Sequence, residues 1–115
     1  MWQKLKMLWQ RQPEAIAKRI PIAGLRYYRA GELAEWIRCG DTLDLVPEVD
    51  NPHDPNAIMV LWHHNKIGYV PGDQARRLQG LLGRRLSVKG RVVTICPERG
   101  ASRWLECDIY TQRFC

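Results

Sequence analysis

Residues 45–60 read LVPEVDNPHDPNAIMV, and two apolar stretches in them flank a turn rich in proline, asparagine and aspartate. Proline fixes its own φ and favours extended geometry in the residue before it. Asn and Asp side chains add hydrogen bonds to the backbone. We therefore expect two strands joined by a short, stiff loop with His53 and Asp54 near its apex. Stiff polar loops often hold functional residues, but this composition is also typical of an ordinary turn between strands.

The segments around this loop predict a small, mainly β domain with short helices. A short helical segment is expected at 31–38 and a longer helix from Asp73, as its cap, to Gly83. Alternating or continuous apolar residues predict strands at 19–28, 42–49, 57–62, 66–70, 85–95 and 103–110. The strands at 57–62 and 66–70 form a hairpin and count as one strand region. One helix between this third strand region and the fourth is the layout of a small OB-like β barrel, a fold that binds nucleic acids on one face.

Length and composition indicate one folded domain. The chain has 115 residues, of which 45% are hydrophobic and 26% charged, so it can form one core. No run of about 18 apolar residues exists, and the N-terminus lacks a secretory signal, so we expect a cytoplasmic or nucleoid-associated protein with no membrane partner. Residues 2–10 predict an amphipathic helix that ends before Pro13. The expected organisation is this helix and a linker at 1–18, and the barrel at 19–115.

The charge balance favours a polyanionic partner. The formal net charge is +6 and the isoelectric point is about 9.5, and such values are common in nucleic-acid-binding domains. A group of arginines at the end of the predicted helix could attract phosphates without sequence preference, or could be a solvated helix face. These arginines are Arg76, Arg77, Arg84 and Arg85.

Three blocks of the chain resemble the HIRAN domain, a family found beside the motors of certain SWI/SNF-type helicases and as small stand-alone bacterial proteins. The blocks are GLRYY at 24–28, EVDNPHDPNAI at 48–58 and IGYVP at 67–71, followed by Ala75. Together they span roughly residues 19–110. The resemblance implies an OB-like barrel that binds single-stranded DNA and captures free 3′ ends. It also implies an accessory role in DNA repair or replication, with no catalytic residue, metal or other cofactor.

The resemblance also implies which residues contact DNA. They are Arg26, Tyr27, His53, Asp54 and Tyr69. The family often has tyrosine where His53 stands, so this side chain offers less area for stacking on a base. Secondary candidates are Tyr28, Lys66, Trp104 and Tyr110, of which the last two could instead pack against the N-terminal helix.

A carboxylate such as Asp54 can distinguish the end of a DNA strand from its middle. A 3′ terminus offers a hydroxyl that donates a hydrogen bond, whereas an internal position offers an anionic phosphate. The carboxylate accepts from the first and repels the second. The alternative for Asp54 is a purely structural role in the turn.

Two other functions are compatible with the residues. One is a protein-interaction module in which residues 1–12 bind a protein partner or a second copy of the chain. The other is a metal-dependent nuclease or phosphoesterase built from acidic residues and histidines. Its candidates are Asp50, His53, Asp54, His63 and His64. Adjacent histidines on a strand point to opposite faces, and no zinc-type spacing is present, so we expect neither an enzyme nor a metal site.

Overall fold

The computed structural model describes residues 15–82, 87–96 and 104–112. The predicted N-terminal helix and Gly83 lie outside these ranges. The elements are β1 (Ala15–Pro21), the 3₁₀ helix η1 (Leu25–Tyr27), α2 (Ala30–Leu33), β2 (Thr42–Pro47), β3 (Ile58–Trp62), β4 (Asn65–Tyr69), α3 (Gly72–Leu82), β5 (Ser87–Ile95) and β6 (Leu105–Gln112). As predicted, the fold is mainly β and its longest helix lies between β4 and β5.

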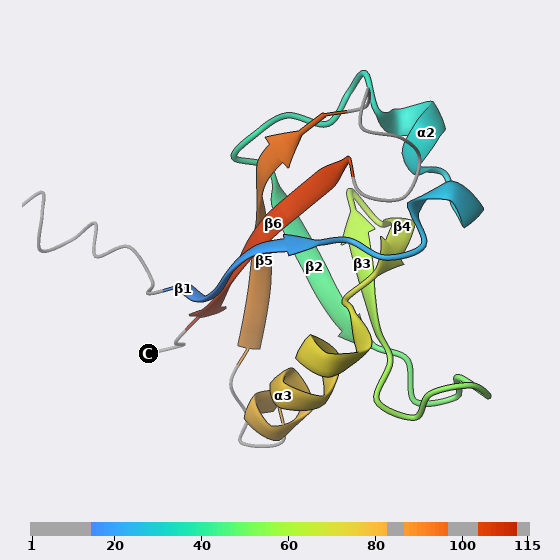
Figure 1. Cartoon of the computed structure of the whole chain (residues 1–115), viewed down its shortest axis with the longest axis vertical. Coiled ribbons are helices and arrows are strands. Elements are labelled where there is room, and N and C mark those ends of the chain that lie inside the picture. Colours follow the sequence, from blue (N-terminus) through green and yellow to red (C-terminus); the bar gives the residue numbers. More distant parts are fainter. Residues whose placement is uncertain (1–14, 83–86, 97–103, 113–115) are drawn as a thin grey trace, which may run out of the picture.

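The six strands form one antiparallel sheet in the order β1-β6-β5-β2-β3-β4. Figure 1 shows the sheet strongly curved, with α3 near one end of the molecule and η1 and α2 near the other. The segment after β1 returns to the opposite edge, where Ala23 and Tyr69 exchange two backbone hydrogen bonds of 2.8 and 2.9 Å. This single bridge joins the two edges of an otherwise open sheet, in agreement with an OB-like architecture.

The bridge depends on the close approach of two backbones at Gly68. A Cβ atom at this position would lie 2.4 Å from the carbonyl oxygen of Ala23 and 2.7 Å from Cγ2 of Ile22. Real Cβ atoms do not come so close to other heavy atoms. A glycine is therefore required where β4 meets the segment after β1.

The core lies inside the curved sheet, and α3 contributes Ala75 and Leu78 to it. Apolar residues alternate with more exposed ones along the strands, as a half-buried sheet requires. Burial of these side chains supplies the main stabilisation of the fold. The fully buried large residues are Ile22, Leu25, Ile37, Leu43, Ile58, Val60, Ile67, Leu78, Val92, Leu105, Cys107 and Ile109.

The prediction of a strand at 19–28 was wrong at both ends. β1 begins at Ala15, inside the predicted linker, and ends at Pro21. Gly24 then adopts a left-handed conformation with φ of 74°, which glycine allows at little cost. The chain turns there, and Leu25–Tyr27 form a 3₁₀ helix in place of a strand.

Three other boundaries differ from the prediction. The helix expected at 31–38 is limited to Ala30–Leu33, and the chain continues as a turn in which Trp36 and Ile37 donate their backbone N–H groups to the Leu33 carbonyl at 2.9 and 3.2 Å. β2 ends at Pro47 rather than Val49, whose side chain is exposed. α3 begins at Gly72, so Asp73 lies in its first turn rather than at the cap.

The turn between β3 and β4 holds two histidines in left-handed conformations. The φ angles of His63 and His64 are 45° and 68°, as expected for a two-residue type I′ turn, which prefers Asn-Gly. The His63 ring packs edge-on against Trp62 at 4.4 Å, so His64 is the better position to change. His64→Gly should raise the free energy of unfolding by about 0.5–1 kcal/mol in urea denaturation. The same substitution at His53, whose φ is not positive, should give no gain; an equal gain there would contradict this explanation.

Candidate functional site

The loop between β2 and β3 is organised by its own polar side chains. The Asn51 side-chain oxygen accepts hydrogen bonds from the backbone N–H groups of His53 and Asp54, at 2.8 and 2.9 Å. One carboxylate oxygen of Asp54 accepts the N–H of Asn56 at 2.9 Å. The loop therefore has the turn chemistry that its sequence predicts, and its conformation presents an exposed His53 beside a partly buried Asp54.

Three polar side chains meet beside this loop, and we call Glu48, Lys66 and Tyr69 the polar triad. Glu48 directly follows β2, whereas Lys66 and Tyr69 both lie on β4. The Lys66 ammonium donates to the Tyr69 hydroxyl at 2.6 Å and to Glu48 at 3.1 Å. The Tyr69 hydroxyl donates to the other oxygen of Glu48 at 2.7 Å. Asn51 donates its side-chain N–H to that same oxygen at 2.8 Å. Asn51 thus connects the polar triad to the backbone of the loop.

The register of the sheet brings the polar triad together. β3 lies between β2 and β4, and it pairs Pro47 with Ile58 and Tyr69 with Met59. The residue after Pro47 and the last residue of β4 therefore lie on the two sides of the start of β3. Long side chains can reach each other across that one strand.

Aromatic rings surround the Lys66 ammonium. Its nitrogen lies 4.6 Å from the centre of the Tyr28 ring and 4.4 Å from that of the Tyr69 ring. The two rings are 5.7 Å apart and pack edge-to-face. Cations at this distance are attracted to the faces of aromatic rings, so Lys66 holds both tyrosines in a defined arrangement.

The hydrogen bonds of the polar triad stabilise its charged groups. Tyr69, Asn51 and Lys66 all donate to Glu48, which lowers the pKa of this carboxyl from its ordinary value of 4.5. Partial burial works against the charged form of Lys66, but hydrogen bonds to Tyr69 and Glu48 outweigh it and raise the pKa of the ammonium. Both groups are therefore ionised at neutral pH.

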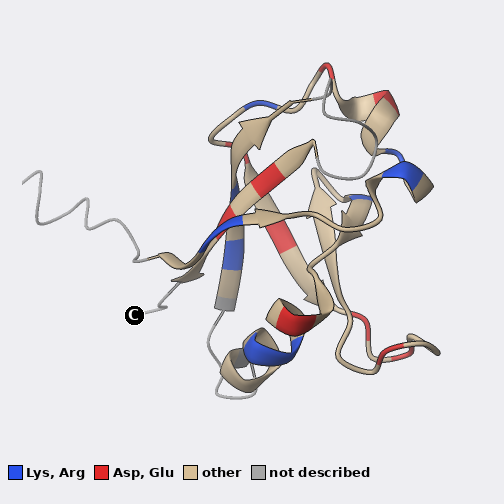
Figure 2. Cartoon of the chain, in the orientation of Figure 1, with Lys and Arg blue, Asp and Glu red and all other residues tan. Residues whose placement is uncertain are grey.

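Arg26 and Tyr27 lie on η1, directly before Tyr28. Tyr27 is 76% exposed, and the Arg26 guanidinium lies 5.8 Å from the centre of its ring. In Figure 1, η1 and the β2–β3 loop project from the same side of the molecule, with β4 between them. Figure 2 shows basic residues at η1 and acidic residues in the loop.

The two remaining candidates are buried and lie in different places. Trp104 is 5% exposed, but it lines a surface hollow of about 430 Å³ together with Arg26 and Tyr28. Tyr110 is 8% exposed and lies under the guanidinium of Arg91 in the middle of the sheet. The structure thus brings Trp104 close to the residues of η1 and places Tyr110 elsewhere.

Sequence reasoning gave Asn51 only a role in stabilising the turn and gave Glu48 none, although both belong to the block that carries the resemblance. The carboxylate of Glu48 is the acceptor that connects Lys66, Tyr69 and Asn51. An acidic residue at the end of a predicted strand, three positions before an Asn-Pro turn, was the available signal. The pairing with β4 depends on the register of the sheet, which the sequence does not specify.

The described residues contain no group of three or more His, Cys, Asp or Glu side chains placed to hold a metal ion. His63 and His64 lie at the β3–β4 turn, whereas His53 and Asp54 lie on the β2–β3 loop. Within residues 15–82, 87–96 and 104–112, no helix has the length and apolar character needed to cross a membrane.

Comparisons with known proteins agree with the fold. The model of the HIRAN domain family matches residues 17–112. The structure is similar to the crystal structure of a Lactobacillus plantarum protein, with a TM-score of 0.71, 25% identity and coverage of 87% of this chain and 97% of that one. It is also similar to the crystal structure of the HIRAN domain of human HLTF, with a TM-score of 0.65, 22% identity and coverage of 83% and 74%. A search of curated proteins found no match.

Proposed function

Since this chain belongs to the HIRAN domain family, we propose that it binds single-stranded DNA at free 3′ ends, as a non-catalytic module that serves DNA repair or replication. The observation that carries the proposal is the hydrogen-bonded connection from Tyr69 through Glu48 and Asn51 to the loop backbone. It fixes the Tyr69 ring relative to the backbone of His53 and Asp54 before any ligand arrives. A preorganised site loses less entropy when it binds.

The terminal nucleotide would be read by Asp54. One of its oxygens is already used by the N–H of Asn56, and the second can accept the hydrogen bond of a 3′ hydroxyl. A hydrogen bond to a charged group contributes about 1.5–3 kcal/mol. A phosphate at the same place would be repelled. The site would therefore prefer a free 3′ hydroxyl by roughly one to two orders of magnitude.

The last bases would stack on exposed side chains around the loop and η1. Tyr27 and His53 offer exposed rings, and Tyr28 and Tyr69 offer partly exposed edges that Lys66 holds in place. Stacking contributes about 1–3 kcal/mol per base and accepts any base. Arg26 would contact a phosphate or a base face. Binding of this kind is independent of sequence.

Asp54→Asn tests the assignment of the end-reading carboxylate. The variant keeps an oxygen for the N–H of Asn56 but loses the negative charge. In fluorescence anisotropy, wild type should bind a 3′-hydroxyl oligonucleotide roughly 10- to 100-fold more tightly than its 3′-phosphate counterpart, and Asp54→Asn should abolish this difference. Asp50→Asn removes the same charge from an exposed position in the same loop and should preserve the difference. Equal affinity of wild type for both oligonucleotides would refute 3′-end capture.

A further inference from the structure

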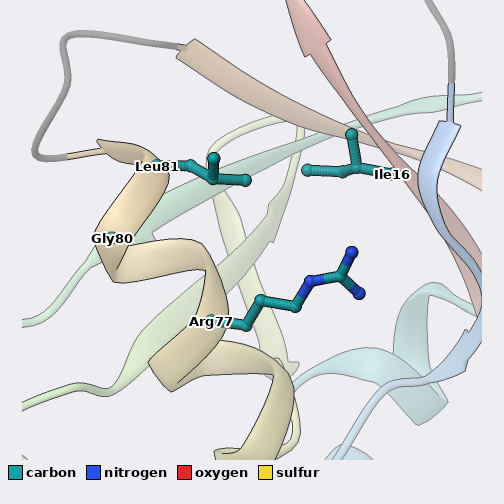
Figure 3. A pocket seen from close by; sticks show the side chains of 4 residues that line it. All are labelled: Ile16, Arg77, Gly80 and Leu81. Carbon is teal, nitrogen blue, oxygen red and sulfur yellow. The ribbon is translucent and has the colours of Figure 1, made fainter.

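A second surface hollow lies between β1 and α3, and we call it the β1–α3 groove. It has a volume of about 340 Å³ and is lined by Ile16, Arg77, Gly80 and Leu81. Figure 3 shows Ile16 and Leu81 pointing toward each other across it, with the Arg77 guanidinium extending into the space between the helix and the strand. None of these residues belongs to the polar triad, the β2–β3 loop or η1.

Gly80 lies in the last turn of α3 and forms part of the groove. No described atom lies within 4 Å of the place where its Cβ would be, so packing does not require a glycine here. Glycine is also a poorer helix former than alanine. The missing side chain leaves room for another molecule to approach the helix backbone closely.

The charges around the groove favour an anionic occupant. Arg77 lines the groove, and Arg76 precedes Arg77 on α3. Lys18 lies two residues after Ile16 on β1, and all three basic side chains are exposed. Within the described residues, none of these three side chains forms a salt bridge. The chain's own N-terminal segment is a poor occupant, because it carries Lys4, Lys6 and Arg11 against a single acid, Glu14.

We infer that the β1–α3 groove binds the sugar–phosphate backbone of a DNA strand, apart from the site that captures the 3′ end. The inference rests on the proposed function for its choice of polyanion. Arg77 pairs with a phosphate, while Ile16, Leu81 and the open space at Gly80 accept the apolar face of the sugar. Such contacts position the strand and carry no sequence information. The groove thus holds internal nucleotides and needs no free end.

Two variants separate this surface from the end-binding site. The probe is a single-stranded oligonucleotide of roughly 20 nucleotides that ends in a 3′-phosphate, measured by anisotropy at several salt concentrations. Arg77→Gln should weaken its binding roughly tenfold and lower the slope of log K against log salt by about 0.7. Gly80→Leu fills the groove without changing charge and should also weaken binding. Arg38→Gln, the same substitution at an exposed arginine before β2, is the matched control.

The outcomes distinguish the two proposals. The groove is supported if both groove variants bind the oligonucleotide more weakly while the ratio of affinities for 3′-hydroxyl and 3′-phosphate ends stays the same. This ratio tests end capture alone, so the groove is supported whether or not the ratio favours the hydroxyl. Equal losses in Arg77→Gln and Arg38→Gln would show only an effect of net charge and would overturn the inference. Gly80→Leu could also lower the melting temperature, and this effect could disappear when Trp2 and Trp9 are changed to Ala. That result would place the N-terminal segment in the groove and would also overturn the inference.

Discussion

Gly68→Ala should destabilise the domain by about 3 kcal/mol. The added methyl would overlap the carbonyl oxygen of Ala23 and the side chain of Ile22. Overpacking of a tight contact costs about 1–3 kcal/mol, and each of the two backbone hydrogen bonds between Ala23 and Tyr69 contributes about 1 kcal/mol. The bridge would open, and η1 would lose its fixed position beside β4. Urea denaturation at neutral pH measures the change.

Gly72→Ala is the matched control for this prediction. Gly72 starts α3, and no described atom lies within 4 Å of the place where its Cβ would be. The substitution should leave stability unchanged or raise it slightly, because alanine favours helix. If Gly68→Ala were as stable as Gly72→Ala, the backbone bridge would not be the feature that closes the fold.

Glu48→Gln should have the second-largest effect, a loss of about 2 kcal/mol at neutral pH. The carboxylate accepts hydrogen bonds from Lys66, Tyr69 and Asn51, and its side chain is only 24% exposed. In the variant, the NH₂ group of glutamine replaces the carboxylate oxygen that accepts from Lys66. The Lys66 ammonium then faces a second hydrogen-bond donor and loses its acceptor. The oxygen that remains still accepts from Asn51 and Tyr69 but carries no charge, so both hydrogen bonds are weaker, and oligonucleotide affinity should fall with stability.

The effect of Glu48→Gln should depend on pH. The pKa of Glu48 is lower in the folded protein than its ordinary value of 4.5, so the carboxylate contributes its full stability above about pH 4.5. This contribution is lost as the pH falls through the folded-state pKa. The difference in free energy of unfolding between wild type and variant should therefore be constant near neutral pH and shrink below pH 4.5.

Glu32→Gln provides the control for the same substitution in an exposed ion pair. Glu32 pairs with Arg29, and the two side chains are 73% and 62% exposed. Exposed pairs of this kind contribute at most about 0.5 kcal/mol. A similar loss in Glu32→Gln and Glu48→Gln, or a loss in Glu48→Gln that persists unchanged at low pH, would contradict the role of the polar triad.

The sequence predicted the fold well where a pattern repeats along the chain. Alternating or continuous apolar residues predicted β2, β3, β5 and β6, and the cluster of Asn, Asp and Pro predicted the loop at 51–56. The prediction from sequence failed where a single residue changes the direction of the chain. The left-handed turn at Gly24 ends the first strand region, and Gly interrupts strands for several different reasons.

The sequence predicted most residues of the candidate site but not the hydrogen bonds that connect them. The resemblance indicated Tyr69 and the loop residues, and the composition of the loop indicated its turn. The contact of Glu48 with Tyr69 requires the pairing of β3 with both neighbouring strands, because the two residues are far apart in the sequence. The burial of Trp104 likewise depends on packing between distant segments, which no local pattern specifies.

The most direct test of 3′-end capture is an NMR titration of ¹⁵N-labelled protein with a single-stranded oligonucleotide of about four nucleotides. With a free 3′ hydroxyl, the largest shifts should occur at the amides of His53 and Asp54, whose N–H groups bond to Asn51, and around Tyr69. A 3′-phosphate on the same oligonucleotide should greatly reduce these shifts. If both oligonucleotides shift the same amides equally, or leave the loop and Tyr69 unchanged, this site does not capture 3′ ends.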